Sequence, residues 1–150
     1  MLQRLSRSLR RPHARLLTRL LTGLAAAAGS VALAAAAPLP ALYTASQATA
    51  GHATFEAHCS MCHGKNLEGI SGPALIGQGF ASAANNYTVA AIFDELSQQM
   101  PAGAPGSLSH KDYADIMAFI LSKNGYPAGS TALTYAAAGA STAKLVSQVK

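Results

Sequence analysis

The chain has 150 residues, 50% of them hydrophobic, with two cysteines and no tryptophan. This length allows one domain and leaves little for a second, and the hydrophobic content excludes a disordered polar tail. All six arginines precede residue 20, so residues 1–48 carry +6, whereas residues 49–150 carry five lysines against six acidic residues, or −1. The net positive charge therefore comes from the N-terminal segment alone. Because the rest of the chain is not basic, we predict no nucleic-acid partner.

Residues 1–48 have the pattern of an export signal. The arginines end at Arg19, and an uncharged stretch rich in alanine and leucine follows. Basic residues followed by an apolar stretch and small residues are typical of a secretory signal. We therefore interpret residues 1–48 as a general secretory signal peptide, cleaved before Thr49 or Gly51, with an earlier option after residues 34–36. The mature protein would then be periplasmic.

Two alternatives remain for this segment. The 23 residues 20–42 are uncharged, and about 20 apolar residues span a bilayer. An uncleaved anchor in the inner membrane, facing the periplasm, therefore stays open, although two glycines and two prolines weaken it. A mitochondrial presequence is also arginine-rich and poor in acidic residues, but the later small-residue sites favour bacterial export.

The rest of the chain predicts a small all-α domain of three to four helices over residues 49–127, with an extension rich in Ala, Ser and Thr over 128–150. A first helix is expected from about Thr49 into the cysteine motif, and the glycine-rich segment 65–84 is expected as a loop. A second helix is expected after Thr88, with Val89, Ile92, Phe93 and Leu96 on one face, and a third from the capping pair Ser109 and Asp112 to Asn124-Gly125.

Both cysteines lie in one pentapeptide, Cys59-Ser60-Met61-Cys62-His63. C-x-x-C-H is typical of covalent haem attachment. Two thiols on one helical turn can each form a thioether with a haem vinyl group, and the adjacent histidine is then held under the ring, facing the iron. We predict one haem c, bound covalently through Cys59 and Cys62, with His63 as an iron ligand.

Other uses of this motif fit less well. A thioredoxin-like dithiol is expected after a strand, whereas the flanks here are predicted to be helical and the usual neighbouring tryptophan is absent. A structural zinc site needs four ligands, and only His52 and His58 are near enough to assist the cysteines. A disulfide across three residues would be strained.

A low-spin haem needs a second axial ligand. Met61 lies inside the attachment loop and cannot reach the opposite face of the ring. Met117 belongs to an apolar stripe with helical spacing and is expected in the core. Met100 precedes Pro101, which favours an extended backbone that can aim the Met100 side chain at the haem. We predict Met100 as the second ligand, with His110 as the fallback and packing of Met100 on the haem edge as the alternative.

The attachment motif, the segment Gly72-Pro73-Ala74-Leu75, Met100-Pro101 and a closing amphipathic helix together resemble a class I c-type cytochrome over about residues 50–126. The resemblance implies that the Pro73 carbonyl accepts a hydrogen bond from His63, which orients the imidazole ring. It also implies that the first and last helices cross where a small residue meets aromatic side chains. Gly51 and Phe55 match the first helix, and Phe119 and Tyr113 are candidates on the last.

The resemblance implies a one-electron carrier, not an enzyme, that links a periplasmic dehydrogenase to a terminal oxidase. The charge of −1 over residues 49–150 lacks the lysines that surround the haem edge in mitochondrial cytochromes c, so we expect apolar docking with modest salt dependence. Two alternatives stay open: a haem-based sensor or small enzyme with an open iron site, and a membrane-anchored cytochrome subunit of a dehydrogenase complex. The extension is expected to wrap the domain partly.

Overall fold

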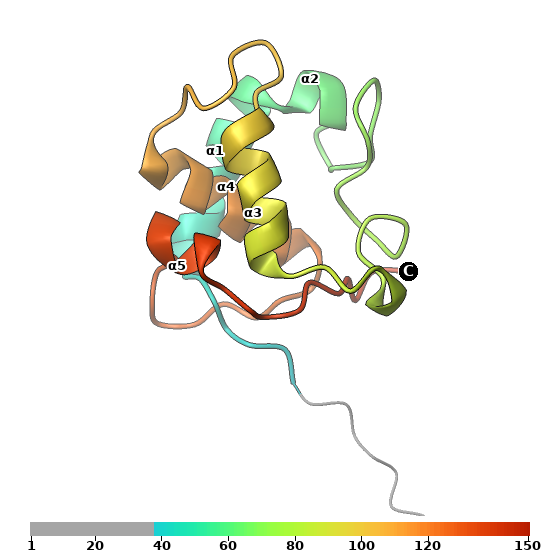
Figure 1. The fold of residues 1–150 in the computed structure, drawn as a ribbon, viewed down its shortest axis with the longest axis vertical. Coiled ribbons are helices and arrows are strands. Elements are labelled where there is room, and N and C mark those ends of the chain that lie inside the picture. The colour runs from blue at the N-terminus through green and yellow to red at the C-terminus, as the bar shows by residue number, and fades with distance from the viewer. Residues whose placement is uncertain (1–37) are drawn as a thin grey trace, which may run out of the picture. The chain divides into compact units, whose positions relative to one another are not determined.

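The computed structural model describes residues 38–150, and the expected signal segment up to residue 37 lies outside them. The described residues contain helices and no β-strand, as the sequence predicts (Figure 1). Residues 38–150 form five α-helices rather than three or four, because the attachment motif forms a separate turn and the C-terminal extension adds a short helix. Their bounds are Ala45–His58 (α1), Ser60–His63 (α2), Val89–Gln99 (α3), His110–Lys123 (α4) and Tyr135–Gly139 (α5), with a 3-10 turn at Ala83–Asn85.

The folded part begins earlier than the expected boundary between residues 48 and 49, which falls inside α1. Thr44 caps this helix by accepting a hydrogen bond from the backbone N–H of Gln47. The Gln47 amide is buried and exchanges two hydrogen bonds with the backbone of Leu133. Tyr43 is also buried, and its hydroxyl donates to the carbonyl of Tyr126 at 2.6 Å. The sequence predicts a later start, at about Thr49, because residues 43–48 are uncharged and also fit the end of a signal peptide.

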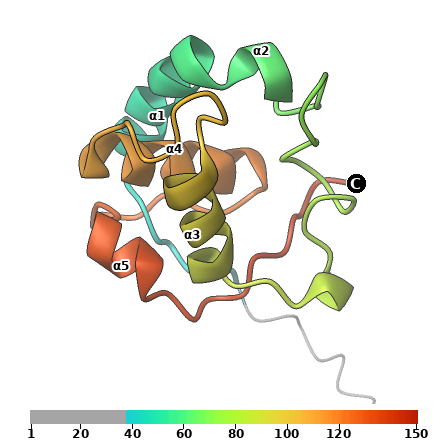
Figure 2. The same ribbon diagram turned by 45° about the horizontal axis from the view of Figure 1, so that its top comes forward.

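Helices α1 and α4 lie against each other (Figure 2). A Cβ atom on Gly51 would lie 1.8 Å from the carbonyl oxygen of Asp115, so only glycine allows the two backbones to approach this closely. The rings of Phe55 and Phe119 pack beside this point with centroids 5.3 Å apart. Phe119 is therefore the aromatic partner at the crossing, and Tyr113 has a different contact, described below.

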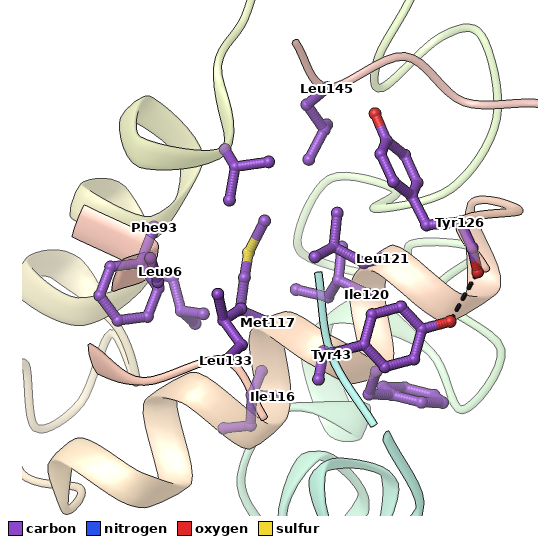
Figure 3. Packing of buried hydrophobic residues seen from close by; sticks show 14 of the residues in the cluster. Tyr43, Phe93, Leu96, Ile116, Met117, Ile120, Leu121, Tyr126, Leu133 and Leu145 are labelled. Atoms are coloured by element: carbon purple, nitrogen blue, oxygen red, sulfur yellow. Dashed lines mark hydrogen bonds between the residues drawn. The ribbon is translucent and has the colours of Figure 1, made fainter. Parts of the chain in front are cut away.

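The core gathers around α4. Met117 is fully buried among side chains of α3, α4 and the C-terminal segment, which confirms its assignment to the core (Figure 3). Thr88 and Ser109 cap α3 and α4 as predicted, each by accepting a backbone N–H bond. The buried residues labelled with Met117 are Tyr43, Phe93, Leu96, Ile116, Ile120, Leu121, Tyr126, Leu133 and Leu145.

The extension wraps the domain. Helix α5 packs on α3 and α4, and the chain then runs past the start of α3 to the loop that follows α2 (Figure 1). Leu145 is fully buried, and the N–H of Ser147 donates to the carbonyl of Ala81 at 2.8 Å. Within residues 38–150, none of the helices has the length and apolar character required to cross a membrane.

Candidate functional site

The cysteine motif forms a turn of its own between α1 and the following loop. Helix α1 ends at His58, and the carbonyl of Cys59 accepts the N–H groups of Cys62 and His63 at 3.1 and 3.0 Å. This geometry places the two half-buried thiols one turn apart on the same side of the chain. Gly64, at φ +77°, ends the turn in a conformation that side-chain-bearing residues rarely adopt.

The electrostatics of the thiols argue against a redox dithiol. Burial, together with the neighbouring Cys62, raises the pKa of the Cys59 thiol to about 11. Redox dithiols instead have one acidic thiol that is a thiolate near neutral pH. The raised pKa of Cys59 is therefore the opposite of what a redox dithiol requires.

The imidazole of His63 is held in one orientation. It is 8% exposed, and its Nδ1 lies 2.8 Å from the carbonyl oxygen of Pro73. Because a carbonyl can only accept, Nδ1 carries the proton and Nε2 keeps its lone pair for a metal ion. The loop that carries Pro73 is tied to the motif, since the N–H of Gly72 donates to the carbonyl of Cys62 at 2.9 Å.

Met100 lies at the C-terminal end of α3 and lines the same cavity as His63 and the two cysteines. Its backbone is extended, with φ −118° and ψ 153°, as the following proline favours, and the residue is half-buried. Its carbonyl accepts the hydroxyl of Tyr113 at 2.7 Å and the N–H of Gly106 at 3.3 Å.

A cavity of about 400 Å³ brings the predicted site residues together. Cys59, Cys62, His63, Pro73 and Met100 all line it. The rest of its wall is largely apolar, and His58, Ser71 and Glu95 are the exposed polar residues on it. Cavities of this size and character bury most of a cofactor's surface. The apolar side chains on the wall are Phe55, Leu75, Phe80, Ile92, Leu96, Ile116 and Ile120.

These residues fit a haem. Two thiols and an imidazole with a free Nε2 are the donor set of the attachment motif, and the thioether of Met100 is the kind of second ligand found in such sites. A Cβ atom on Gly72 would lie 3.0 Å from Cε1 of His63, so glycine at this position keeps the loop close to the ring.

Apart from His58, which is exposed on the cavity wall, the other ligand candidates lie away from it. His110, the fallback ligand, is exposed at the start of α4 and stacks on Tyr135 with centroids 3.9 Å apart. His52 stacks on Phe119 at 4.7 Å. Met61 is 84% exposed. Met100 is thus the methionine that lines the cavity among the described residues.

Two residues near the site were assigned other roles from the sequence. Tyr113 was expected at the helix crossing, and Asn124 only as a helix end. Asn124 is fully buried, and its amide donates to the carbonyl of Leu75 and accepts the N–H of Gly77, holding the loop beyond Pro73. A buried asparagine just before a C-terminal glycine resembles an ordinary helix stop in sequence, so no local signal distinguishes it.

An all-α fold that surrounds an apolar cavity with a C-x-x-C-H turn defines a class I c-type cytochrome, with haem c attached at Cys59 and Cys62. The sequence model of the family described as cytochrome c oxidase, cbb3-type, subunit III matches residues 46–120, half of the chain. The chain belongs to this family of c-type cytochrome domains, whose haem transfers electrons.

A search of solved structures found a related chain. A chain in the crystal structure of the sulfane dehydrogenase SoxCD from Paracoccus pantotrophus is 28% identical, with a TM-score of 0.50. The match covers 59% of this chain and 49% of that chain, so the protein corresponds to about half of its relative. The comparison with curated proteins found no match.

Proposed function

We propose that the protein is a periplasmic one-electron carrier in which His63 and Met100 are the two axial ligands of the haem iron. The observation that carries this proposal is that His63, whose Nε2 is free, and Met100 line one apolar cavity, which the two attachment cysteines also line. When bound, the haem supplies one redox-active iron that gains and loses an electron without a bond change in any substrate.

The protein's own groups prepare this site. The Pro73 carbonyl holds the Nδ1 proton of His63 and increases the basicity of Nε2. The apolar wall excludes water, and the soft thioether of Met100 favours ferrous iron, so we expect a positive midpoint potential. With His63 and Met100 both holding the iron, no position would be left open for an external ligand. An electron carrier is therefore favoured over a sensor or an enzyme with an open iron site.

Optical spectra test the ligand assignment. We expect the haem-loaded protein to be low-spin in both oxidation states, to show the weak far-red band of sulfur ligation when ferric, and to bind CO slowly when ferrous. Met100→Ala should abolish the far-red band and speed CO binding. Met61→Ala is the matched control, since Met61 is exposed and away from the cavity. A band that survives Met100→Ala would contradict Met100 ligation.

We propose a dehydrogenase as the electron donor and a terminal oxidase as the acceptor. The donor is supported by the similar chain in the sulfane dehydrogenase SoxCD. Two large hydrophobic side chains near the attachment motif favour an apolar docking surface: Met61 is 84% and Ile70 72% exposed, and the Ile70 N–H donates to the Cys62 carbonyl. Exposed large apolar side chains beside a functional site are typical of partner surfaces. Slow reduction of the purified protein by a periplasmic dehydrogenase from the same cells would argue against this assignment.

We also propose that export removes residues 1–36 and leaves a haem domain that includes the extension, over residues 37–150. Cleavage before Thr49 would remove the buried contacts of Tyr43 and Gln47 described above. The earlier small-residue site at 34–36 spares both. The intact mass of the exported protein distinguishes the possibilities, since an uncleaved anchor would retain the full N-terminus and cleavage at Thr49 would give a shorter chain.

A further inference from the structure

The hydroxyl of Tyr113 joins α4 to both ends of the loop that begins at Met100. It donates to the Met100 carbonyl at 2.7 Å and accepts the N–H of Leu108 at 3.4 Å. Tyr113 itself is 2% exposed and its partners Met100 and Leu108 are half-buried, so these bonds are partly shielded from water. Hydrogen bonds in such surroundings hold their partners more firmly than exposed ones do.

The loop between these two points has few other attachments. Residues 102–107 are all exposed, and a Cβ atom on Gly103 would meet no atom within 4 Å. The Met100 N–H donates to the Leu96 carbonyl at 3.3 Å, at the end of α3, and the remaining bonds are within the loop, such as that from the Gly106 N–H to the Met100 carbonyl at 3.3 Å. A segment with few buried contacts opens locally at low cost in free energy. One buried hydroxyl therefore restrains the position of the Met100 backbone.

We infer that Tyr113 is a positioning residue that keeps the Met100 side chain at the iron, an inference that rests on the proposed axial role of Met100. Without the hydroxyl, the Met100 carbonyl keeps only the bond from the Gly106 N–H, at 3.3 Å. The Leu108 N–H loses its bond to Tyr113. The loop then opens more often, and Met100 spends more time away from the cavity. An external ligand that competes for the vacant position measures this directly.

The test compares two haem-loaded full-chain variants that each lose one buried tyrosine hydroxyl. Tyr113→Phe removes the bond to Met100, whereas Tyr43→Phe removes a comparable bond, from a 3% exposed tyrosine to the Tyr126 carbonyl at 2.6 Å. Imidazole is titrated into each ferric protein and followed by loss of the far-red band. Haem content and thermal unfolding are measured in parallel, so that the two variants can be compared at similar stability.

We expect Tyr113→Phe to keep the far-red band without imidazole but to bind imidazole about threefold to tenfold more tightly than the parent, as expected for one lost hydrogen bond. Tyr43→Phe should bind imidazole as the parent does. Equal affinities in the two variants would overturn the role of Tyr113 alone. A parent protein without the far-red band would instead overturn Met100 ligation, and the role of Tyr113 with it.

Discussion

The Nδ1 of His63 lies 2.8 Å from the carbonyl oxygen of Pro73, and Gly72 lies directly against the same ring. The contact with Pro73 selects the tautomer, leaves Nε2 free and fixes the direction of the Nδ1–H bond, because the N–H must point at the carbonyl oxygen. Gly72 and Pro73, which both contact the imidazole of His63, are therefore constrained by the position of this ring.

We expect Gly72→Ala to disturb this arrangement. The added Cβ would lie 3.0 Å from Cε1 of His63, and a ring held by Pro73 and, in the proposed haem site, by the iron could not yield without lengthening one of those bonds. A weaker bond to Pro73 makes the imidazole less basic, so the midpoint potential should rise, and stability should fall by about 1–3 kcal/mol. Redox titration and thermal unfolding measure both.

Gly79→Ala is the control for this substitution, because a Cβ at Gly79 would meet no atom within 4 Å. It should leave the midpoint potential unchanged. A Gly72→Ala protein with the parent's potential would show that the ring adapts without cost.

Asn124→Ala should weaken the loop that lies behind the haem site. Its buried amide donates to the Leu75 carbonyl at 2.9 Å and accepts the Gly77 N–H at 3.2 Å, and alanine leaves both groups without this partner. We expect the free energy of unfolding to fall by about 2–4 kcal/mol in denaturant titrations. The midpoint potential should also change, since Leu75 lines the cavity two residues after Pro73.

Gln47→Ala is the matched variant, since it also removes two buried amide bonds, both to Leu133. Its stability should fall comparably while its midpoint potential stays that of the parent. If both variants shift the potential equally, general destabilisation rather than the loop contact is responsible.

The ion pair of Lys111 and Asp115 should contribute a stability that depends on pH. The hydrogen bond and charge of Asp115 raise the pKa of Lys111 above 10.5. A raised lysine pKa means that the folded state holds the proton more tightly, so this stabilisation is present below pH 10.5 and is lost as pH rises through the folded pKa. The difference in melting temperature between the parent and Lys111→Met should therefore be constant near neutral pH and shrink at high pH. A difference that grows at high pH would contradict this coupling.

Electron self-exchange between two copies tests the apolar docking surface. Met61→Ser and Ile70→Ser remove the two most exposed large hydrophobic side chains among the described residues. We expect each variant to keep the parent spectrum but to exchange electrons several-fold more slowly, as measured by NMR line broadening of half-reduced samples. Tyr87→Ser, at a 39% exposed tyrosine that does not line the haem cavity, is the control. Strong salt dependence in the parent would point instead to charged docking.

The site residues were predictable to different degrees. The attachment motif is local, because a C-x-x-C-H turn needs neighbouring residues alone. The caps at Thr88 and Ser109 and the core position of Met117 also follow from short patterns and were confirmed. The start of α1 was not predictable, because Thr44 and the residues after it fit both a helix and a signal peptide. The hydrogen bond from Gln47 to the carbonyl of Leu133, which assigns these residues to the domain, is evident only in the structure.

The sequence by itself therefore determined the class of protein, the cofactor and the all-helical fold, since each depends on residue spacing within one turn or one helix. Only the tertiary structure decided the roles of Tyr113 and Asn124, the inclusion of Tyr43 in the domain, and the wrapping of residues 128–150. The first three are hydrogen bonds between side chains and backbone groups 13 to 83 residues apart, and the wrapping rests on the burial of Leu145 and a backbone bond from Ser147 to Ala81. Such bonds form where packing places a donor beside an unpaired carbonyl, and no local pattern encodes that meeting.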